Sequence, residues 1–117
     1  MRKHVSFLSF LMIIVLVLNM FAPSGLATTK LIKDPFLEES IKNMLYMSPE
    51  EELTKEDLEN LDYLYVSGDF ENDAMDLSGL EHAVNLTGLT ITYQQIKNLT
   101  PLENLTNLNY LEIYNSN

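Results

Sequence analysis

The stretch "NLTPLENLTNLNYLEIYNSN", residues 98–117, spaces its apolar side chains in a way that fits neither a helix nor a strand. These side chains are Leu99, Leu102, Leu105, Leu108, Leu111 and Ile113, so the steps are three, three, three, three and two. An amphipathic helix requires steps of three and four, and a half-buried strand requires steps of two. The stretch therefore predicts a compound unit, in which a return segment with three residues per turn leads into one short strand.

The same spacing occurs 22 residues earlier, in "DLSGLEHAVNLTGLTITYQQ" at residues 76–95, where seven of the 20 aligned positions are identical. There the six slots hold Leu77, Leu80, Ala83, Leu86, Leu89 and Ile91. A period of this length with L-x-x-L-x-L inside it is typical of leucine-rich repeats. One repeat buries too little apolar surface to fold alone, so we expect an α/β solenoid in which residues 89–91 and 111–113 lie side by side in a parallel sheet. The alternative is an ordinary α/β domain whose leucines recur by chance.

A degenerate first repeat precedes these two. In "LENLDYLYVSG", residues 58–68, the positions of Leu61, Leu64 and Val66 match those of Leu86, Leu89 and Ile91. The interval is 25 residues instead of 22, and we place the surplus in the loop at 68–76. The predicted repeats therefore occupy residues 65–117, with full-spaced units at 76–97 and 98–117.

Two helices are expected before the repeats. "DPFLEESIKNML", residues 34–45, offers Asp34 as an N-cap and Pro35 at the first helical position. Its apolar stripe at helical spacing consists of Leu37, Ile41, Met44 and Leu45. In "LTKEDL", residues 53–58, Thr54 and Asp57 have the spacing of a capping box. We expect residues 28–64 to form a helical N-terminal cap over the first repeat.

Residues 1–27 have the three-part pattern of a secretory signal peptide. A basic start, "MRKH", precedes the apolar run "FLSFLMIIVLVL" (7–18), and "GLA" at 25–27 provides small residues for cleavage near Ala27. The alternative is an uncleaved membrane anchor, although the run is shorter than the roughly 20 residues that a spanning helix needs. We therefore expect a secreted or cell-surface protein.

The remaining chain carries 17 acidic and five basic residues, a net charge of −12. Nucleic acid and anionic membrane surfaces both require clustered lysine and arginine, so neither is expected as a partner. The absence of cysteine excludes a bacterial lipoprotein anchor and a disulfide framework. This composition is consistent with a bacterial exported protein that is held together by packing.

The segments "DPFLEESIKNML", "LTKEDLENLDYL", "DLSGLEHAVNLTGLTI" and above all "NLTPLENLTNLNYLEI" resemble the internalin-type leucine-rich-repeat proteins of Gram-positive bacteria. The resemblance implies a curved, non-catalytic solenoid that binds a protein, such as a host-cell surface protein, or a glycan through its concave sheet face. Where such proteins usually place asparagine after the strand, this chain has Asp69, Gln94 and Ser116. Their larger number of repeats makes truncation an expectation, and the alternative function is a truncated remnant that binds nothing.

Catalytic, metal and cofactor sites are not expected. The one histidine after the signal peptide, His82, lies on a return segment with no orienting partner nearby in the sequence. The acidic loop at 69–76 has Ala74 and Leu80 where an EF-hand requires glycine and glutamate, which leaves a weak, irregular cation site as the alternative. A secreted hydrolase is the third and least supported function.

The outward strand positions are the candidate partner-binding residues. In register they form two columns of side chains, which are Tyr65, Thr90 and Glu112, and Ser67, Thr92 and Tyr114. Tyrosine is enriched in binding interfaces, but tyrosine and threonine are also good strand residues. Their position on the sheet, more than their residue type, supports binding.

Overall fold

The computed structural model describes residues 29–69, 71 and 73–114. The predicted signal peptide and Ser116 lie outside the described residues. Among those that are described, no helix is both long and apolar enough to cross a lipid bilayer.

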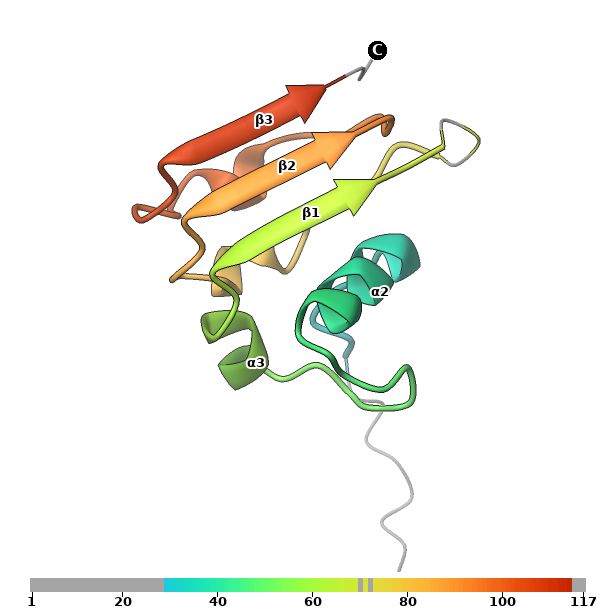
Figure 1. Cartoon of the computed structure of the whole chain (residues 1–117), viewed down its shortest axis with the longest axis vertical. Coiled ribbons are helices and arrows are strands. Elements are labelled where there is room, and N and C mark those ends of the chain that lie inside the picture. Colours follow the sequence, from blue (N-terminus) through green and yellow to red (C-terminus); the bar gives the residue numbers. More distant parts are fainter. Residues whose placement is uncertain (1–28, 70, 72, 115–117) are drawn as a thin grey trace, which may run out of the picture.

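The centre of the fold is a three-stranded parallel sheet with the strand order β1-β2-β3 (Figure 1). The strands are β1 Tyr63–Ser67, β2 Gly88–Thr92 and β3 Tyr110–Tyr114. Leu89 pairs with Leu111 and Ile91 pairs with Ile113, which confirms the predicted side-by-side arrangement. Leu64 and Val66 pair with Leu89 and Ile91, so the longer first interval leaves the strand register unchanged.

The return segments adopt the predicted three-residue geometry. The 3-10 helix η1 spans Leu80–His82 and η2 spans Thr100–Leu102, and the two are in contact. Each turns one leucine inward, since Leu80 and Leu102 are both buried. The three-residue turn keeps successive leucines on the core side of the chain, which explains the run of threes in the sequence.

The surplus residues of the first interval lie in the loop after β1. Residues 68–74 connect β1 to Met75, whereas residues 93–95 connect β2 to Ile96, and Met75 and Ile96 form a parallel bridge. Gln94 is buried beside this loop, and its side-chain amide donates to the carbonyl of Asp73 at 3.0 Å. Gln94, which stands where the resembling proteins usually place asparagine, thus binds the backbone of the preceding loop through its side-chain amide.

Helix α2 Pro35–Met44 lies along β1 on the side opposite β2, as Figure 1 shows. The Asp34 carboxylate caps it by accepting from the backbone N–H groups of Phe36 and Leu37, at 3.0 and 3.1 Å. Its apolar stripe faces the sheet, with Leu37 and Ile41 fully buried. The predicted N-cap residue is confirmed, and of the predicted apolar stripe Leu37 and Ile41 are buried while Met44 and Leu45 are partly buried.

Helix α3 Lys55–Glu59 begins with the predicted capping box. The Thr54 hydroxyl accepts from the N–H of Asp57 at 3.2 Å, and the Asp57 carboxylate accepts from the N–H of Thr54 at 2.9 Å. Leu58 anchors this short helix in the core and is fully buried.

Two asparagines at equivalent repeat positions connect successive turns of the chain. The side-chain amide of Asn85 donates to the carbonyl of Glu59, and that of Asn107 donates to the carbonyl of Val84, both at 2.8 Å. Each amide therefore satisfies a carbonyl in the preceding unit. This shared contact explains why both repeats have asparagine at the aligned position.

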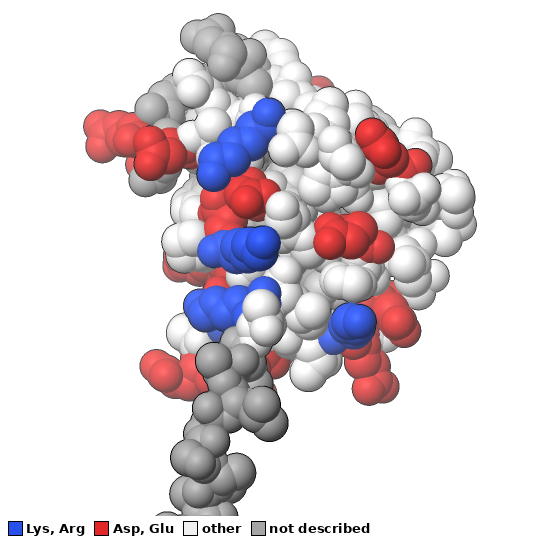
Figure 2. Space-filling view, turned by 180° about the vertical axis from the view of Figure 1, so that it is seen from behind, with Lys and Arg blue, Asp and Glu red and all other residues white. Residues whose placement is uncertain are grey.

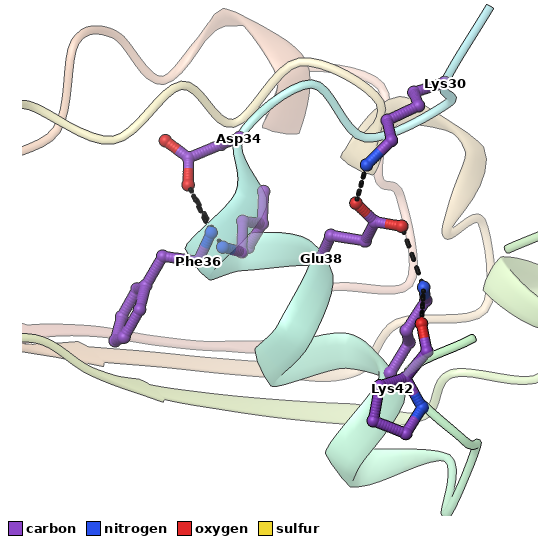
Figure 3. Close-up of polar contacts among 7 residues, drawn as sticks. Lys30, Asp34, Phe36, Glu38 and Lys42 are labelled. Carbon is purple, nitrogen blue, oxygen red and sulfur yellow. Dashed lines mark hydrogen bonds and ion pairs between the residues drawn. The ribbon is translucent and has the colours of Figure 1, made fainter. Parts of the chain in front are cut away.

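An ion-pair cluster connects α2 to the segments on either side of it (Figure 3). The Glu38 carboxylate accepts from the ammonium groups of Lys30 and Lys42, both at 2.9 Å. Lys42 also donates to the carbonyl of Pro49 at 3.0 Å. Hydrogen bonds from Lys30 first, and then from Lys42, hold the pKa of Glu38 below its ordinary value of 4.5, although burial acts in the opposite direction.

The core consists of the repeat slots together with the inner faces of the helices. Burial changes along the stack, because Leu64 and Leu89 have no exposed area whereas Leu111, in the equivalent slot of β3, is 47% exposed. The difference arises because β1 lies between α2 and β2, and β2 lies between two strands, whereas β3 has a described neighbour on one side only. Equivalent leucines should therefore contribute unequally to stability.

Substitution of Leu89 and Leu111 tests this dependence on neighbours. We expect Leu89→Ala to lower the free energy of unfolding by about 3 kcal/mol, because it opens a cavity at a fully buried position. Leu111→Ala should cost less than about 1 kcal/mol, since its side chain already faces solvent in part. Urea denaturation of the full chain measures both values, and equal losses would contradict the stacking interpretation.

Substitution of Glu38 tests the ion-pair cluster through its pH dependence. Because the folded pKa lies below the unfolded one, the carboxylate stabilises the fold above about pH 4.5, and this stabilisation disappears as pH falls through the folded pKa. Glu38→Gln should therefore lower stability by about 1–3 kcal/mol at pH 7, where it leaves Lys42 buried without its charged partner. In acid, the variant and the parent chain should converge. A stability difference independent of pH would show that packing, and not charge, explains the loss.

Candidate functional site

The face of the sheet opposite η1 and η2 presents the outward strand positions. In register these form three columns, which are Tyr63–Gly88–Tyr110, Tyr65–Thr90–Glu112 and Ser67–Thr92–Tyr114. The alternation of side chains along each strand places all nine positions on this one face. We call this surface the tyrosine face, after Tyr63, Tyr65, Tyr110 and Tyr114.

The tyrosines of β1 reach across to the next strand. The Tyr63 hydroxyl lies 2.7 Å from the hydroxyl of Thr90, and the Tyr65 hydroxyl lies 3.4 Å from that of Thr92. In each contact the threonine lies on the neighbouring strand β2, two residues beyond the residue that pairs with the tyrosine. Because the rings lean across β2 in this way, they are held in place before any partner arrives.

This arrangement corrects one sequence-based expectation. Thr90 and Thr92 belong to the outward face, but they are only 5% and 9% exposed. The bonds from Tyr63 and Tyr65 place phenol groups over the two threonine hydroxyls. The expectation that these threonines are accessible is wrong, and their observed role is to hold the tyrosines of β1.

Gly88 provides the space that the ring of Tyr63 occupies. A Cβ atom at this position would lie 2.5 and 2.8 Å from ring carbons Cδ2 and Cε2 of Tyr63, closer than any ordinary contact. The ring can therefore cross β2 toward Thr90 only because position 88 has no side chain. The glycine is a packing requirement of the tyrosine face.

Glu112 is the one acidic side chain among the nine outward positions, which include no lysine, arginine or histidine. The Tyr110 hydroxyl donates to its carboxylate at 2.7 Å. This hydrogen bond, together with the negative charge of Glu112, raises the pKa of Tyr110 above its usual value of 10.0. Tyr110 therefore remains a neutral phenol at physiological pH. By contrast, contacts with the hydroxyls of Thr92 and then Ser67 lower the pKa of Tyr65.

The sequence-predicted candidates do lie together, because Tyr65, Ser67, Glu112 and Tyr114 are all exposed on the tyrosine face. Sequence reasoning missed Tyr63 and Tyr110, which are 40% and 49% exposed at the first position of their strands. The signal that could have found them is the same alternation, since each lies two residues before a predicted candidate. Extending the columns by one position would have included them.

The back of the molecule carries mixed charge. Figure 2 shows lysine side chains in a column with aspartate and glutamate close beside them. A cavity of about 440 Å³ on the described surface has Lys33 and Lys97 in its wall, together with Asp34, Asp73 and Asp76. The three carboxylates outnumber the two ammonium groups, so the wall has no excess of positive charge that would favour an anion.

The acidic loop and the histidine show no assembled metal site. Within residues 29–69, 71 and 73–114, no group of three or more histidine, aspartate or glutamate side chains could hold a metal ion. The Asp69 carboxylate accepts from the N–H of Glu71, and the Asp76 carboxylate accepts from the N–H and hydroxyl of Ser78. The two hydrogen bonds from Ser78, that of its hydroxyl first and then that of its N–H, lower the pKa of Asp76.

No family model matches this chain, and no curated protein is significantly similar to it. Among solved structures, an internalin (InlF) from Listeria monocytogenes has a TM-score of 0.61 and 31% identity, covering 76% of this chain and 27% of that one. Internalin C2 (InlC2) from the same organism has a TM-score of 0.60 and 31% identity, covering 71% and 36%.

A third similar structure contains CBM51-2 in complex with GlcNAc and the INT domains of Clostridium perfringens ZmpB. Its TM-score is 0.57 and its identity 38%, covering 68% of this chain and 16% of that one. The chain thus spans between 16% and 36% of the length of these three structures. The similarity to these structures agrees with the parallel sheet and with the repeat spacing of the sequence. The chain therefore has an internalin-type leucine-rich-repeat fold.

Proposed function

We propose that this chain is an exported, non-catalytic module of internalin type that binds a protein partner through the tyrosine face. In this proposal the repeats form a solenoid, the tyrosine face is its concave side, and α2 and α3 are its N-terminal cap. The apolar run and small residues of the first 27 positions support export, and the internalin-like structures support a surface or secreted location. A host-cell surface protein is the partner class that the sequence resemblance favours.

One observation carries the proposal. Four tyrosines lie on one face of a three-stranded sheet, and each is between 40% and 57% exposed. Large aromatic side chains that keep this much surface in water contribute strongly to binding when a partner covers them. The hydroxyl bonds of Tyr63 and Tyr110 fix two of the rings in advance, which lowers the entropy lost on binding.

The face is also nearly uncharged on a strongly acidic chain. The net charge is −10, yet Glu112 is the single acidic residue among the nine outward positions. Depletion of charge with enrichment of tyrosine is the composition of an interface core. The face is small, because each strand has five residues, so we expect these positions to form part of a larger contact.

Photo-cross-linking tests where a partner binds. The full chain carrying benzoylphenylalanine in place of Tyr114 should cross-link a specific extracellular protein, while the same group in place of Glu59, exposed on α3, should not. For the captured protein, the double variant Tyr65→Ala with Tyr114→Ala should weaken affinity by about 10- to 100-fold, because both aromatic contacts are lost. Equal cross-linking from both positions, or unchanged affinity of the double variant, would overturn the proposal.

Gly88→Ala tests whether binding depends on the position of the Tyr63 ring as well as on its presence. The added methyl would displace the exposed ring of Tyr63 and break its bond to Thr90, with every tyrosine still in the chain. We expect affinity for the cross-linked protein to fall several-fold while the free energy of unfolding drops by about 1 kcal/mol or less, since an exposed ring can rotate away. Unchanged affinity would mean that the placement of Tyr63 is irrelevant to binding.

A further inference from the structure

A shallow groove separates the C-terminal half of α2 from β1, at the end of the tyrosine face. Its volume is about 310 Å³. The wall is formed by Ser40, Asn43, Met44, Tyr46, Tyr65 and Ser67. Two of these residues belong to β1 and the others to α2 or the turn after it, so the groove is continuous with the tyrosine face.

Tyr46 occupies an unusual position in this wall. It follows the C-cap residue Leu45, and its φ of 57° lies in the left-handed region. The N–H of Met47 donates to the carbonyl of Lys42 at 2.9 Å, and the N–H of Tyr46 donates to that of Asn43 at 3.2 Å. These two bonds define a Schellman motif, in which the left-handed residue is usually glycine because a Cβ atom is disfavoured there.

The fold gives no reason for a tyrosine at this position. Its side chain is 96% exposed, so it contributes almost no packing, and its backbone conformation is one that a bulky residue rarely adopts. The Schellman bonds are made by the backbone and would be kept by glycine. A strained, fully exposed aromatic residue beside a groove is therefore best explained by contact with a ligand.

The chemistry of the groove identifies the ligand class. Ser40, Tyr65 and Ser67 each present a hydroxyl, Asn43 presents an amide, and Tyr46 presents an exposed aromatic ring. The Ser40 hydroxyl donates to the carbonyl of Phe36 at 2.9 Å and so remains an acceptor, and the Tyr65 hydroxyl has a long contact of 3.4 Å with that of Thr92. The C–H face of a pyranose ring stacks on an aromatic ring, and its hydroxyls both donate to and accept from hydroxyl and amide groups. We propose that this groove binds a neutral sugar ring, which stacks on Tyr46.

Charge argues against the other small ligands. None of the five described lysines lines the groove, and the net charge of −10 repels anions, so uronic acids and phosphates are disfavoured. No carboxylate lines it either, so a cation has no counter-charge there. A neutral, hydroxyl-rich ligand is the one that these side chains can satisfy.

The groove can be tested with methyl glucoside, methyl galactoside and methyl N-acetylglucosaminide, each added to the labelled full chain in an NMR titration. At least one should shift the signals of Asn43, Tyr46 and Ser67 with a Kd on the order of 1 mM, as expected for so small a ligand. Methyl glucuronide should bind more weakly. Tyr46→Gly should weaken binding at least about fivefold, with the melting temperature at or above that of the parent chain, because the strained tyrosine is gone.

Tyr93→Gly is the matched control. Tyr93 also has a left-handed φ, of 56°, and an exposed ring, but it does not line the groove. This variant should bind the sugar within about twofold of the parent chain. No shift with any of the neutral glycosides, shifts confined to residues outside the groove, or full binding by Tyr46→Gly would each overturn the proposal. Tyr65 and Ser67 belong both to the groove and to the tyrosine face, whereas Tyr46 belongs only to the groove and Tyr114 only to the tyrosine face. Tyr46→Gly therefore tests the sugar groove, and cross-linking from position 114 tests the protein-binding proposal separately.

Discussion

Each repeat depends on its neighbours to bury its apolar side chains, and this requirement organises the molecule. Burial in a slot is complete where both sides are covered, by α2 and β2 for Leu64 and by two strands for Leu89. The same gradient occurs on the return path, where Leu77 is 1% exposed and Leu99 is 45% exposed. The 22-residue period persists because a shift in one repeat would uncover the core of the next.

Because the core lies on one side of the sheet, the other side is free to serve a different purpose. Even so, its residues are not independent of one another. Tyr63 can cross β2 only over Gly88, and it contacts Thr90 where it arrives. A change in one repeat therefore alters what the neighbouring repeat presents. Binding surfaces built on stacked strands should vary in coordinated sets of residues across adjacent strands.

The sequence predicted the parts of this structure that local patterns determine. The Asp34 cap, the Thr54–Asp57 capping box and the three-residue return turns follow from spacing within a few residues. The strand register follows from aligning the repeats at their intervals of 22 and 25 residues. The burial of Thr90 and Thr92 could not be predicted in this way. It is decided by tyrosines 27 residues earlier, whose rings lean across the sheet. Spacing predicts which face a side chain occupies, but not whether a neighbour covers it.

The left-handed conformation of Tyr46 could not be predicted from sequence patterns either. Sequence rules for the end of a helix look for glycine or asparagine, and this chain has neither at the turn after α2. The backbone nevertheless adopts the conformation that those residues favour. Tyr93 adopts the same conformation, but its side chain is 45% exposed and so retains some packing. The side chain of Tyr46 is 96% exposed and contributes almost no packing, which is the observation that favours a contact made by its ring.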